Sequence, residues 1–174
     1  MRRKRPGQRM PDPRSARQIR RKLMSDCCSI SESTAPEPVK TSSKANCVSC
    51  GAVSLPVERL TLLHQLKHPQ LMNIPEVSFH FCVEPDCDLV YFGDDKTVYR
   101  RNDLRQDVGQ KSTNPDRTLC YCFDVKQSNV LEERKMTGQS ESKNFVMEQV
   151  KLKRCACDTR NPSGQCCLKD FPKN

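Results

Sequence analysis

Cys120-Tyr121-Cys122, Cys155-Ala156-Cys157 and Cys166-Cys167 are three cysteine pairs in the last third of a 174-residue chain. They hold six of its twelve cysteines, with 32 residues between the first two pairs and 8 between the last two. A Cys-x-Cys loop is too short for an unstrained disulfide, so its sulfurs suit a shared metal ion or cluster. The intervening residues leave room for two short helices, and Asn161-Pro162-Ser163-Gly164 predicts a chain-reversing turn. We therefore expect the three pairs to converge in one thiolate-lined site.

The residues alone leave the metal open, because four thiolates suit Zn²⁺ and an iron–sulfur cluster equally. The full pattern is Cys120-x-Cys122-Phe123, two helical segments, and Cys155-x-Cys157-x-x-x-Asn161-Pro162-Ser163-Gly164-x-Cys166-Cys167-Leu168. It resembles the N-terminal domain of the CopZ-type copper chaperones, in which this half is similar to a bacterioferritin-associated ferredoxin-like [2Fe–2S] module. The resemblance extends back to Cys47.

This resemblance implies a [2Fe–2S] cluster in the C-terminal half and a mononuclear zinc site in the half before it. The cluster ligands that it implies are Cys120, Cys122, Cys157 and Cys167. Cys155 and Cys166 are the alternates, which could exchange into the cluster or act as reactive thiols. Several pairings of the six thiols can close a four-thiolate cluster, so this choice stays open.

A second cysteine constellation precedes the first. Cys47-Val48-Ser49-Cys50-Gly51 is followed, after 30 intervening residues, by Cys82-Val83-Glu84-Pro85-Asp86-Cys87. Spacings of two and four residues let paired sulfurs bind one ion, and four cysteines leave no open coordination position. The pattern predicts a structural tetrahedral zinc site made by Cys47, Cys50, Cys82 and Cys87.

Other residues near these cysteines are weaker ligand candidates. His80 shares a strand face with Cys82 and could replace one sulfur, and Asp86 and Asp88 flank Cys87. His64 and His68 stand four residues apart on a predicted helix. Because four thiols are already supplied, we interpret these two histidines as surface or packing residues.

Composition indicates a thin core that metals could reinforce. Only 35% of the residues are hydrophobic and tryptophan is absent, and small domains bury too little surface to offset chain entropy easily. The N-terminus has no apolar signal-peptide region, and no apolar run is long enough to span a membrane. We therefore expect a cytoplasmic, reduced and metal-loaded chain rather than a disulfide framework.

The net charge of +9 is confined to the N-terminus. Residues 1–23 contain ten Lys or Arg and one acid, whereas the remaining residues are formally neutral. We expect residues 1–46 to be disordered, because they are polar and rich in Pro and Ser. Residues 1–23 could be an electrostatic arm for nucleic acid or anionic membrane. We favour instead an upstream-start artefact, with Met24 as the natural first residue.

Cys27 and Cys28 are a vicinal thiol pair within this tail. Exposed thiols are reactive and can capture a soft ion such as Cu⁺ transiently. The pair could equally be incidental, since a flexible dithiol loses conformational entropy when it binds.

Periodicity and turn residues predict an α+β protein with three parts. Residues 1–46 form the tail, residues 47–116 a zinc-pinned antiparallel β subdomain, and residues 117–174 a helical [2Fe–2S]-binding subdomain. In the zinc part we expect a helix within 57–66, strands over 77–81, 89–92 and 97–100, and either a strand or a loop over 103–111. In the cluster part, Ser128 and Ser142 are predicted to cap two helices, and Gly138 to end the first.

The first functional hypothesis is an accessory protein of copper or heavy-metal handling. By the resemblance, it would carry a structural zinc and a [2Fe–2S] cluster and act by one-electron transfer, including reduction of Cu(II) to Cu(I), or by metal relay. A copper-transporting ATPase or a separate metallochaperone would be its partner. Family members usually carry a heavy-metal-associated domain with a Met-x-Cys-x-x-Cys loop, a motif that does not occur in this sequence.

Two alternatives belong to other classes. A zinc-ribbon-like nucleic-acid binder would use the basic tail, but the neutral body argues against it. A thiol enzyme would use Cys155 or Cys166 as nucleophile, but no His or Asp stands in a recognisable base relationship to either. We expect a metal-binding or electron-transfer protein rather than an enzyme, without membrane insertion.

Overall fold

The computed structural model describes residues 44–173. Residues 1–43 of the tail predicted over 1–46, including Cys27 and Cys28, lie outside the described residues. Ala45 and Asn46, at the end of that predicted tail, form a short strand instead. Among residues 44–173, no helix has the length and apolar character needed to cross a lipid bilayer.

The first half of the described chain is a five-stranded antiparallel sheet in which neighbours in sequence are neighbours in space. A short helix, α2 (Arg59–Gln65), and a 3₁₀ turn, η1 (Gln70–Asn73), connect the second and third strands. The strands are β1 (Ala45–Asn46), β2 (Val53–Val57), β3 (Phe79–Phe81), β4 (Leu89–Gly93) and β5 (Val98–Arg100). The helix and three strands expected from the sequence are confirmed, each with slightly different ends.

Strand β2 is one of the strands that the sequence analysis did not predict. Its sequence is VSLPV, and a proline argues against an interior strand because it donates no ladder hydrogen bond. β1 pairs with β2 only at Val53 and Ser54. Pro56 therefore lies where β2 has a neighbour on one side only, opposite His80 of β3. A proline is tolerated at such an edge.

The sheet segment, which we define as residues 44–105, has one main apolar core. Phe79 and Phe81 of β3 pack there with Tyr91 of β4, Tyr99 of β5 and Leu62 of α2. His80 points to the opposite face, where it stacks on Phe92 with ring centroids 5.3 Å apart. That second face continues into the cluster of buried cysteines. Alternation of side chains along β3 thus separates the apolar core from the cysteine site.

The connection after β5 forms two 3₁₀ turns rather than a further strand. These are η2 (Arg101–Asp103) and η3 (Gly109–Lys111). Of the two possibilities for residues 103–111, loop is therefore the one observed.

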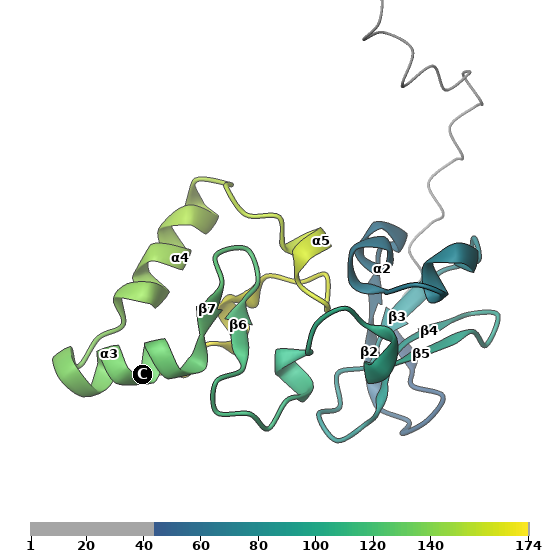
Figure 1. The fold of residues 1–174 in the computed structure, drawn as a ribbon, viewed down its shortest axis with the longest axis horizontal. Coiled ribbons are helices and arrows are strands. Elements are labelled where there is room, and N and C mark those ends of the chain that lie inside the picture. The colour runs from purple at the N-terminus through teal and green to yellow at the C-terminus, as the bar shows by residue number, and fades with distance from the viewer. Residues whose placement is uncertain (1–43, 174) are drawn as a thin grey trace, which may run out of the picture. The chain divides into compact units, whose positions relative to one another are not determined.

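The helical segment, which we define as residues 117–173, begins with a hairpin and continues with two helices and two short helical turns (Figure 1). Val130, Val146 and Phe171 form its core together with Leu119 and Val125. Its elements are β6 (Thr118–Cys120), β7 (Val125–Lys126), α3 (Gln127–Thr137), α4 (Glu141–Lys151), α5 (Cys157–Arg160) and η4 (Cys167–Asp170). The expected α+β architecture is therefore present, with two helices between Cys122 and Cys155.

The predicted helix caps were partly wrong. The N-cap of α3 is Lys126, whose N–H donates to Asn129 Oδ1 at 3.2 Å, so Ser128 lies inside the helix. The N-cap of α4 is Ser140, which accepts from Lys143 N at 3.1 Å, rather than Ser142. Gly138 ends α3 with φ +77°, as predicted. The error at α4 comes from choosing between two nearby serines that fit a cap about equally well. At α3 the side chain of Lys126 makes no cap hydrogen bond, so residue preference could not have identified it.

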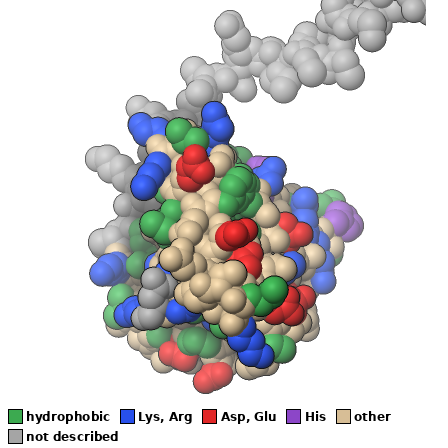
Figure 2. All heavy atoms as spheres, turned by 90° about the vertical axis from the view of Figure 1, so that its left-hand side faces the viewer, with side chains coloured by type: hydrophobic (Ala, Val, Ile, Leu, Met, Phe, Trp, Pro, Cys, Tyr) green, Lys and Arg blue, Asp and Glu red, His purple; other side chains and the backbone are tan. Residues whose placement is uncertain are grey.

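Charges of both signs are interspersed on the face of the molecule that Figure 2 shows. Blue and red side chains lie next to one another there, without a continuous basic patch. This agrees with the formal neutrality of the chain after residue 23.

The sheet segment contacts the loop that carries Cys157 and Cys167 through hydrogen bonds. Gln65 Nε2 of α2 donates to the carbonyls of Thr159 at 3.1 Å and Arg160 at 2.9 Å in α5, and α2 and α5 lie close together in Figure 1. The buried hydroxyl of Tyr91 donates to Pro162 O at 2.6 Å. These bonds fix the backbone just before and within the predicted turn at residues 161–164.

We predict that Tyr91→Phe lowers the free energy of unfolding by about 1–3 kcal/mol, because it leaves the buried Pro162 carbonyl without its donor. Denaturant unfolding of the metal-loaded protein measures this change. Tyr99→Phe is the matched control, since the Tyr99 hydroxyl makes no recorded hydrogen bond within residues 44–173, and we expect it to change stability by less than about 0.5 kcal/mol. Equal effects of the two substitutions would contradict the prediction.

Candidate metal centres

The first cysteine pair lies in the turn between β1 and β2. Cys47 N donates to Ala52 O at 2.8 Å and Gly51 N donates to Cys47 O at 2.9 Å, which folds the turn around both sulfurs. Gly51 adopts φ +76°, a backbone conformation that favours glycine. The local sequence thus produces the metal-binding knuckle that the spacing predicts.

The second pair brackets the connection between β3 and β4. Cys82 follows β3 directly, and its N–H donates to Val90 O at 3.0 Å. Cys87 N donates to Glu84 O at 3.3 Å, which closes the turn containing Pro85. Because β2 pairs with β3, the two cysteine turns meet at the same end of the sheet.

The four sulfurs fit one tetrahedral ion. The ligand atoms of Cys47, Cys50, Cys82 and Cys87 all lie within 4.8 Å of one another, and Cys50 Sγ is 3.6 Å from Cys82 Sγ. Zn–S bonds of about 2.3 Å in a tetrahedron place sulfurs about 3.8 Å apart, whereas a disulfide requires about 2.05 Å. Cys50 is exposed, and the other three side chains are buried.

The alternative ligands do not join this group. His80 Nδ1 lies 3.8 Å from Asp94 Oδ1, and its ring stacks on Phe92. Asp88 pairs with Arg100 at 3.0 Å. Asp86 is exposed and is not part of the group of converging ligand atoms. His64 and His68 are exposed, in agreement with their interpretation as surface residues.

In the metal-free site, burial, neighbouring thiols and backbone donors shift the pKa values of the cysteines in opposite directions. Burial opposes ionisation of Cys47, but the N–H groups of Cys50 and Ser49 outweigh it and lower the Cys47 pKa to about 7. Burial raises the pKa of Cys82 to about 12, and the Cys47 thiol adds to this increase. A thiolate ligand has to lose its proton, so zinc binding would displace these remaining protons.

The second set of thiols converges from four places in the helical segment. Cys120 ends β6, Cys122 lies in the following turn, and Cys157 and Cys167 begin α5 and η4. Cys122 Sγ is 3.8 Å from Cys157 Sγ. A hydrogen bond from Cys167 lowers the pKa of Cys120 to about 7 and that of Cys157 to about 5. Cys167 therefore interacts with both Cys120 and Cys157, while Cys157 interacts with Cys122 and also with Cys155.

The two remaining cysteines of this segment differ in exposure. Cys155 is half-buried and Cys166 is exposed, whereas Cys167 is buried. Burial and the charge of Cys157 raise the pKa of the Cys155 thiol.

The loop between Cys157 and Cys167 is shaped by its own polar side chains. The buried Asn161 Oδ1 accepts from Ser163 N at 3.1 Å, and Asn161 Nδ2 donates to Gln165 O at 2.8 Å. Gly164 has φ +65° and its N–H donates to Asn161 O at 2.8 Å. The turn predicted at residues 161–164 is confirmed.

Apolar side chains pack beside the second thiol set. Phe123 and Leu168 contact the core that contains Cys120 and Cys167, in the positions expected for residues that shield a metal centre from water. Phe123 also makes an edge-to-face contact with Phe145 of α4, with centroids 5.3 Å apart. The helical hairpin thereby supports one side of the Cys122 turn.

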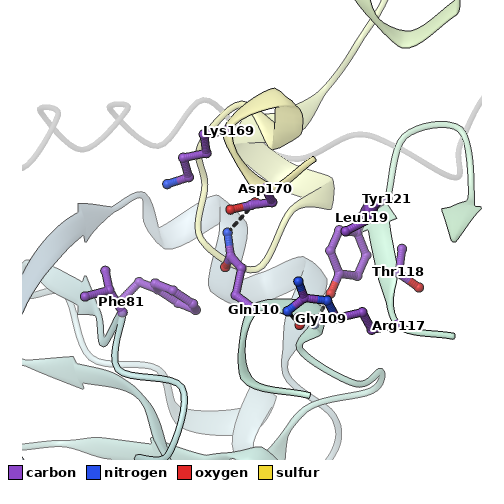
Figure 3. A pocket seen from close by; sticks show the side chains of 10 residues that line it. Phe81, Gly109, Gln110, Arg117, Thr118, Leu119, Tyr121, Lys169 and Asp170 are labelled. Atoms are coloured by element: carbon purple, nitrogen blue, oxygen red, sulfur yellow. Dashed lines mark hydrogen bonds between the residues drawn. The ribbon is translucent and has the colours of Figure 1, made fainter. Parts of the chain in front are cut away.

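A cavity of about 230 Å³ is lined by residues of β3, the connection, β6 and η4 (Figure 3). Gln110 Nε2 crosses it to donate to Asp170 Oδ2 at 2.7 Å. Burial raises the pKa of Asp170. Tyr121 accepts from Gly109 N at 2.6 Å at another wall of the cavity. These bonds fasten the connection to the helical segment.

Comparison with known proteins agrees with this geometry. Residues 44–105, the sheet segment, match the CopZ-type family described as a zinc binding domain. With its four converging sulfurs, the chain is therefore a zinc-binding protein with a four-cysteine site.

Two similar proteins extend the likeness to the helical segment. "Copper chaperone CopZ" of Archaeoglobus fulgidus is 31% identical over 121 residues, which are 70% of this chain and 57% of the relative. The X-ray structure of the Archaeoglobus fulgidus CopZ N-terminal domain superposes with a TM-score of 0.62 at 29% identity, covering 74% of this chain and all of that one. The described chain is a CopZ-type N-terminal domain, and it spans little more than half of the curated relative.

The structure brings together all eight cysteines that the sequence analysis assigned to two metal centres. Cys27 and Cys28, the transient-capture candidates, lie outside the described residues. Sequence reasoning missed two cations beside the zinc site, Arg101 and Lys111. No local motif marks them, because their role depends on the folding of the connection after β5.

We predict that zinc affinity falls steeply as the pH is lowered. Burial raises the pKa of Cys82 to about 12. The Ala52 N–H lowers the pKa of Cys50, but desolvation and the Cys47 thiol together outweigh it, so that this pKa is also raised. Both thiols are protonated near neutral pH, so zinc must displace at least these protons. The logarithm of the zinc association constant should rise by about two or more per pH unit between about pH 6 and 8.

Competition with a zinc chelator at several pH values measures this slope, and calorimetry in buffers of different ionisation enthalpy counts the released protons. A slope near zero would contradict the assignment of thiols as ligands.

Proposed function

We propose that the chain carries a [2Fe–2S] cluster beside its zinc site and serves copper or heavy-metal handling by one-electron transfer. The observation that carries this proposal is the meeting of Cys120, Cys122, Cys157 and Cys167 from sequence positions up to 47 residues apart. Such convergence of free thiols in a folded chain suits a bound metal centre. Without a metal, contact between buried thiols adds little to the stability of the fold, because thiols are weak hydrogen-bonding groups.

The arrangement of the sulfurs supports a cluster over a second single ion. Among residues 44–173, only the zinc thiols form a group of three or more ligand atoms that all lie within 4.8 Å of one another. The second set is less compact: Cys122 Sγ and Cys157 Sγ are 3.8 Å apart, but its four sulfurs do not form such a group. Two metal ions bridged by sulfide need two sulfurs each and a longer span than one ion does.

The surroundings of the second thiol set suit electron transfer. A bound [2Fe–2S] cluster would accept and donate one electron. Phe123 and Leu168 restrict water on one side, while half-buried Cys122 and Cys157 leave another side close to solvent. Arg160 Nη1 donates to Cys122 O at 3.4 Å and holds the Cys122 turn against α5.

Copper is the substrate that we propose, since the similar archaeal protein is named a copper chaperone. In this reaction one electron from the reduced protein converts Cu(II) to Cu(I), and the protein returns to its oxidised state. Soft thiolates bind Cu(I) preferentially. A copper-transporting ATPase or a separate metallochaperone would receive the ion.

Anaerobic purification and metal analysis test the cluster. We expect equimolar iron and sulfide in the proportions of a [2Fe–2S] cluster, one zinc per chain, and visible absorption that dithionite bleaches. Cys157→Ser and Cys167→Ser should lose the iron while retaining zinc. Cys155→Ser and Cys166→Ser are the matched controls, and they should retain both metals. A colourless wild-type protein with two zinc ions would overturn the cluster.

The redox part has its own test. Dithionite-reduced protein, freed of excess reductant, should convert Cu(II) to Cu(I) in the amount of one electron per cluster, with a Cu(I)-specific chelator as detector. The oxidised protein and Cys157→Ser are the controls, and we expect neither to exceed the background from free thiols. Equal yields from wild type and Cys157→Ser would exclude the cluster as the electron source.

A further inference from the structure

Lys111 is a buried cation that the metal centres described so far do not use. Its side chain belongs to η3 and is 2% exposed. The ammonium donates to Glu84 O at 2.6 Å and to Cys87 O at 3.1 Å, and lies 5.8 Å from the centroid of the Phe81 ring. Both carbonyls belong to the loop between the zinc ligands Cys82 and Cys87.

The anionic partner of this ammonium is not a carboxylate. Within residues 44–173, no Asp or Glu oxygen is recorded within 4 Å of Lys111 Nζ. Lysine is almost never fully buried without a compensating charge, because desolvation of the ammonium is costly. The neighbouring site supplies such a charge, since Zn²⁺ with four thiolates carries a net charge of −2.

Arg101 reinforces the same loop. Its Nη2 donates to Pro85 O, and also to Cys87 O at 3.5 Å. Its Nη1 donates to Lys111 O at 2.5 Å, which connects the two cations. Three carbonyls between residues 84 and 87 are thus held by cationic side chains from the connection after β5.

We propose that Lys111 is a positioning residue that neutralises part of the negative charge of the zinc–thiolate complex and holds the Cys82–Cys87 loop in its binding conformation. Lys111 lies beyond residues 44–105, which match the zinc-binding family. The zinc site is therefore completed by a side chain from the connection to the helical segment. Supporting partners of this kind typically contribute about 10–100-fold to metal affinity.

Three substitutions separate the charge of Lys111 from its hydrogen bonds. Lys111→Met keeps the apolar stem but removes both, Lys111→Gln keeps a neutral donor, and Lys111→Arg keeps the charge and donors. Lys67→Met is the matched control, because Lys67 is an exposed lysine of the sheet segment.

Zinc affinity of the full chain is measured under anaerobic conditions by competition with a chromogenic chelator at constant pH and ionic strength. We expect Lys111→Met and Lys111→Gln to weaken zinc binding about 10–100-fold. Lys111→Arg should remain within about threefold of wild type, and Lys67→Met should match wild type. The second thiol set is unchanged in every variant, so differences between variants report on the four-cysteine zinc site.

The zinc affinities of these variants decide for or against the proposal. Wild-type affinity in both neutral variants overturns the proposal, and wild-type affinity in Lys111→Gln alone reduces Lys111 to a hydrogen-bonding role and overturns charge compensation. A neutral variant that cannot refold with added zinc counts as loss of binding only if Lys111→Arg refolds under the same conditions. If Lys111→Arg fails together with the neutral variants, packing of the stem is responsible and the proposal is overturned.

Discussion

Zinc coordination by four thiolates joins the β1–β2 turn to the β3–β4 loop, and the order of the sheet depends on this joint. The strands are two to five residues long, and such short hairpins are marginally stable by themselves. The apolar core around Tyr91 covers one face only. At the other face, buried Cys47, Cys82 and Cys87 take the place of a second apolar core, and metal binding supplies folding free energy there.

The second thiol set depends on the sheet in turn. Gln65 and Tyr91 hold the backbone of α5 and of the adjacent turn, whereas Cys157 and Cys167 lie at the two ends of this same loop. Any displacement of β4 or α2 would therefore shift two of the four thiols relative to Cys120 and Cys122, which belong to a separate hairpin. The sheet segment, which contains the zinc site, thus supports the loop that carries two thiols of the candidate cluster.

Local patterns predicted the features that depend on neighbouring residues. Cysteine spacing predicted the zinc site, and Gly138 and Asn161-Pro162-Ser163-Gly164 predicted a helix end and a turn. β2 escaped prediction because Pro56 is acceptable only where β1 stops short, which is a tertiary fact. The roles of Lys111 and Tyr91 escaped for the same reason, since each acts on a backbone carbonyl far away in sequence. The metal ligands can therefore be identified from nearby residues in the sequence. The side chains that hold those ligands in place cannot, because they come from distant parts of the chain.

The two thiol sets, made of the same ligand type, differ in how they accommodate charge. A zinc–thiolate complex keeps one net charge permanently, so it can be buried against fixed cations such as Lys111 and Arg101. A centre that gains and loses an electron changes its charge, and a fixed counter-ion can match only one of the two states. At the second set Cys122 and Cys157 are half-buried and the nearby cation Arg160 is exposed, unlike the buried Lys111, so water that can reorient with either state shares the compensation of charge. This difference in solvation, with identical sulfur ligands, is what we expect if one site is structural and the other transfers electrons.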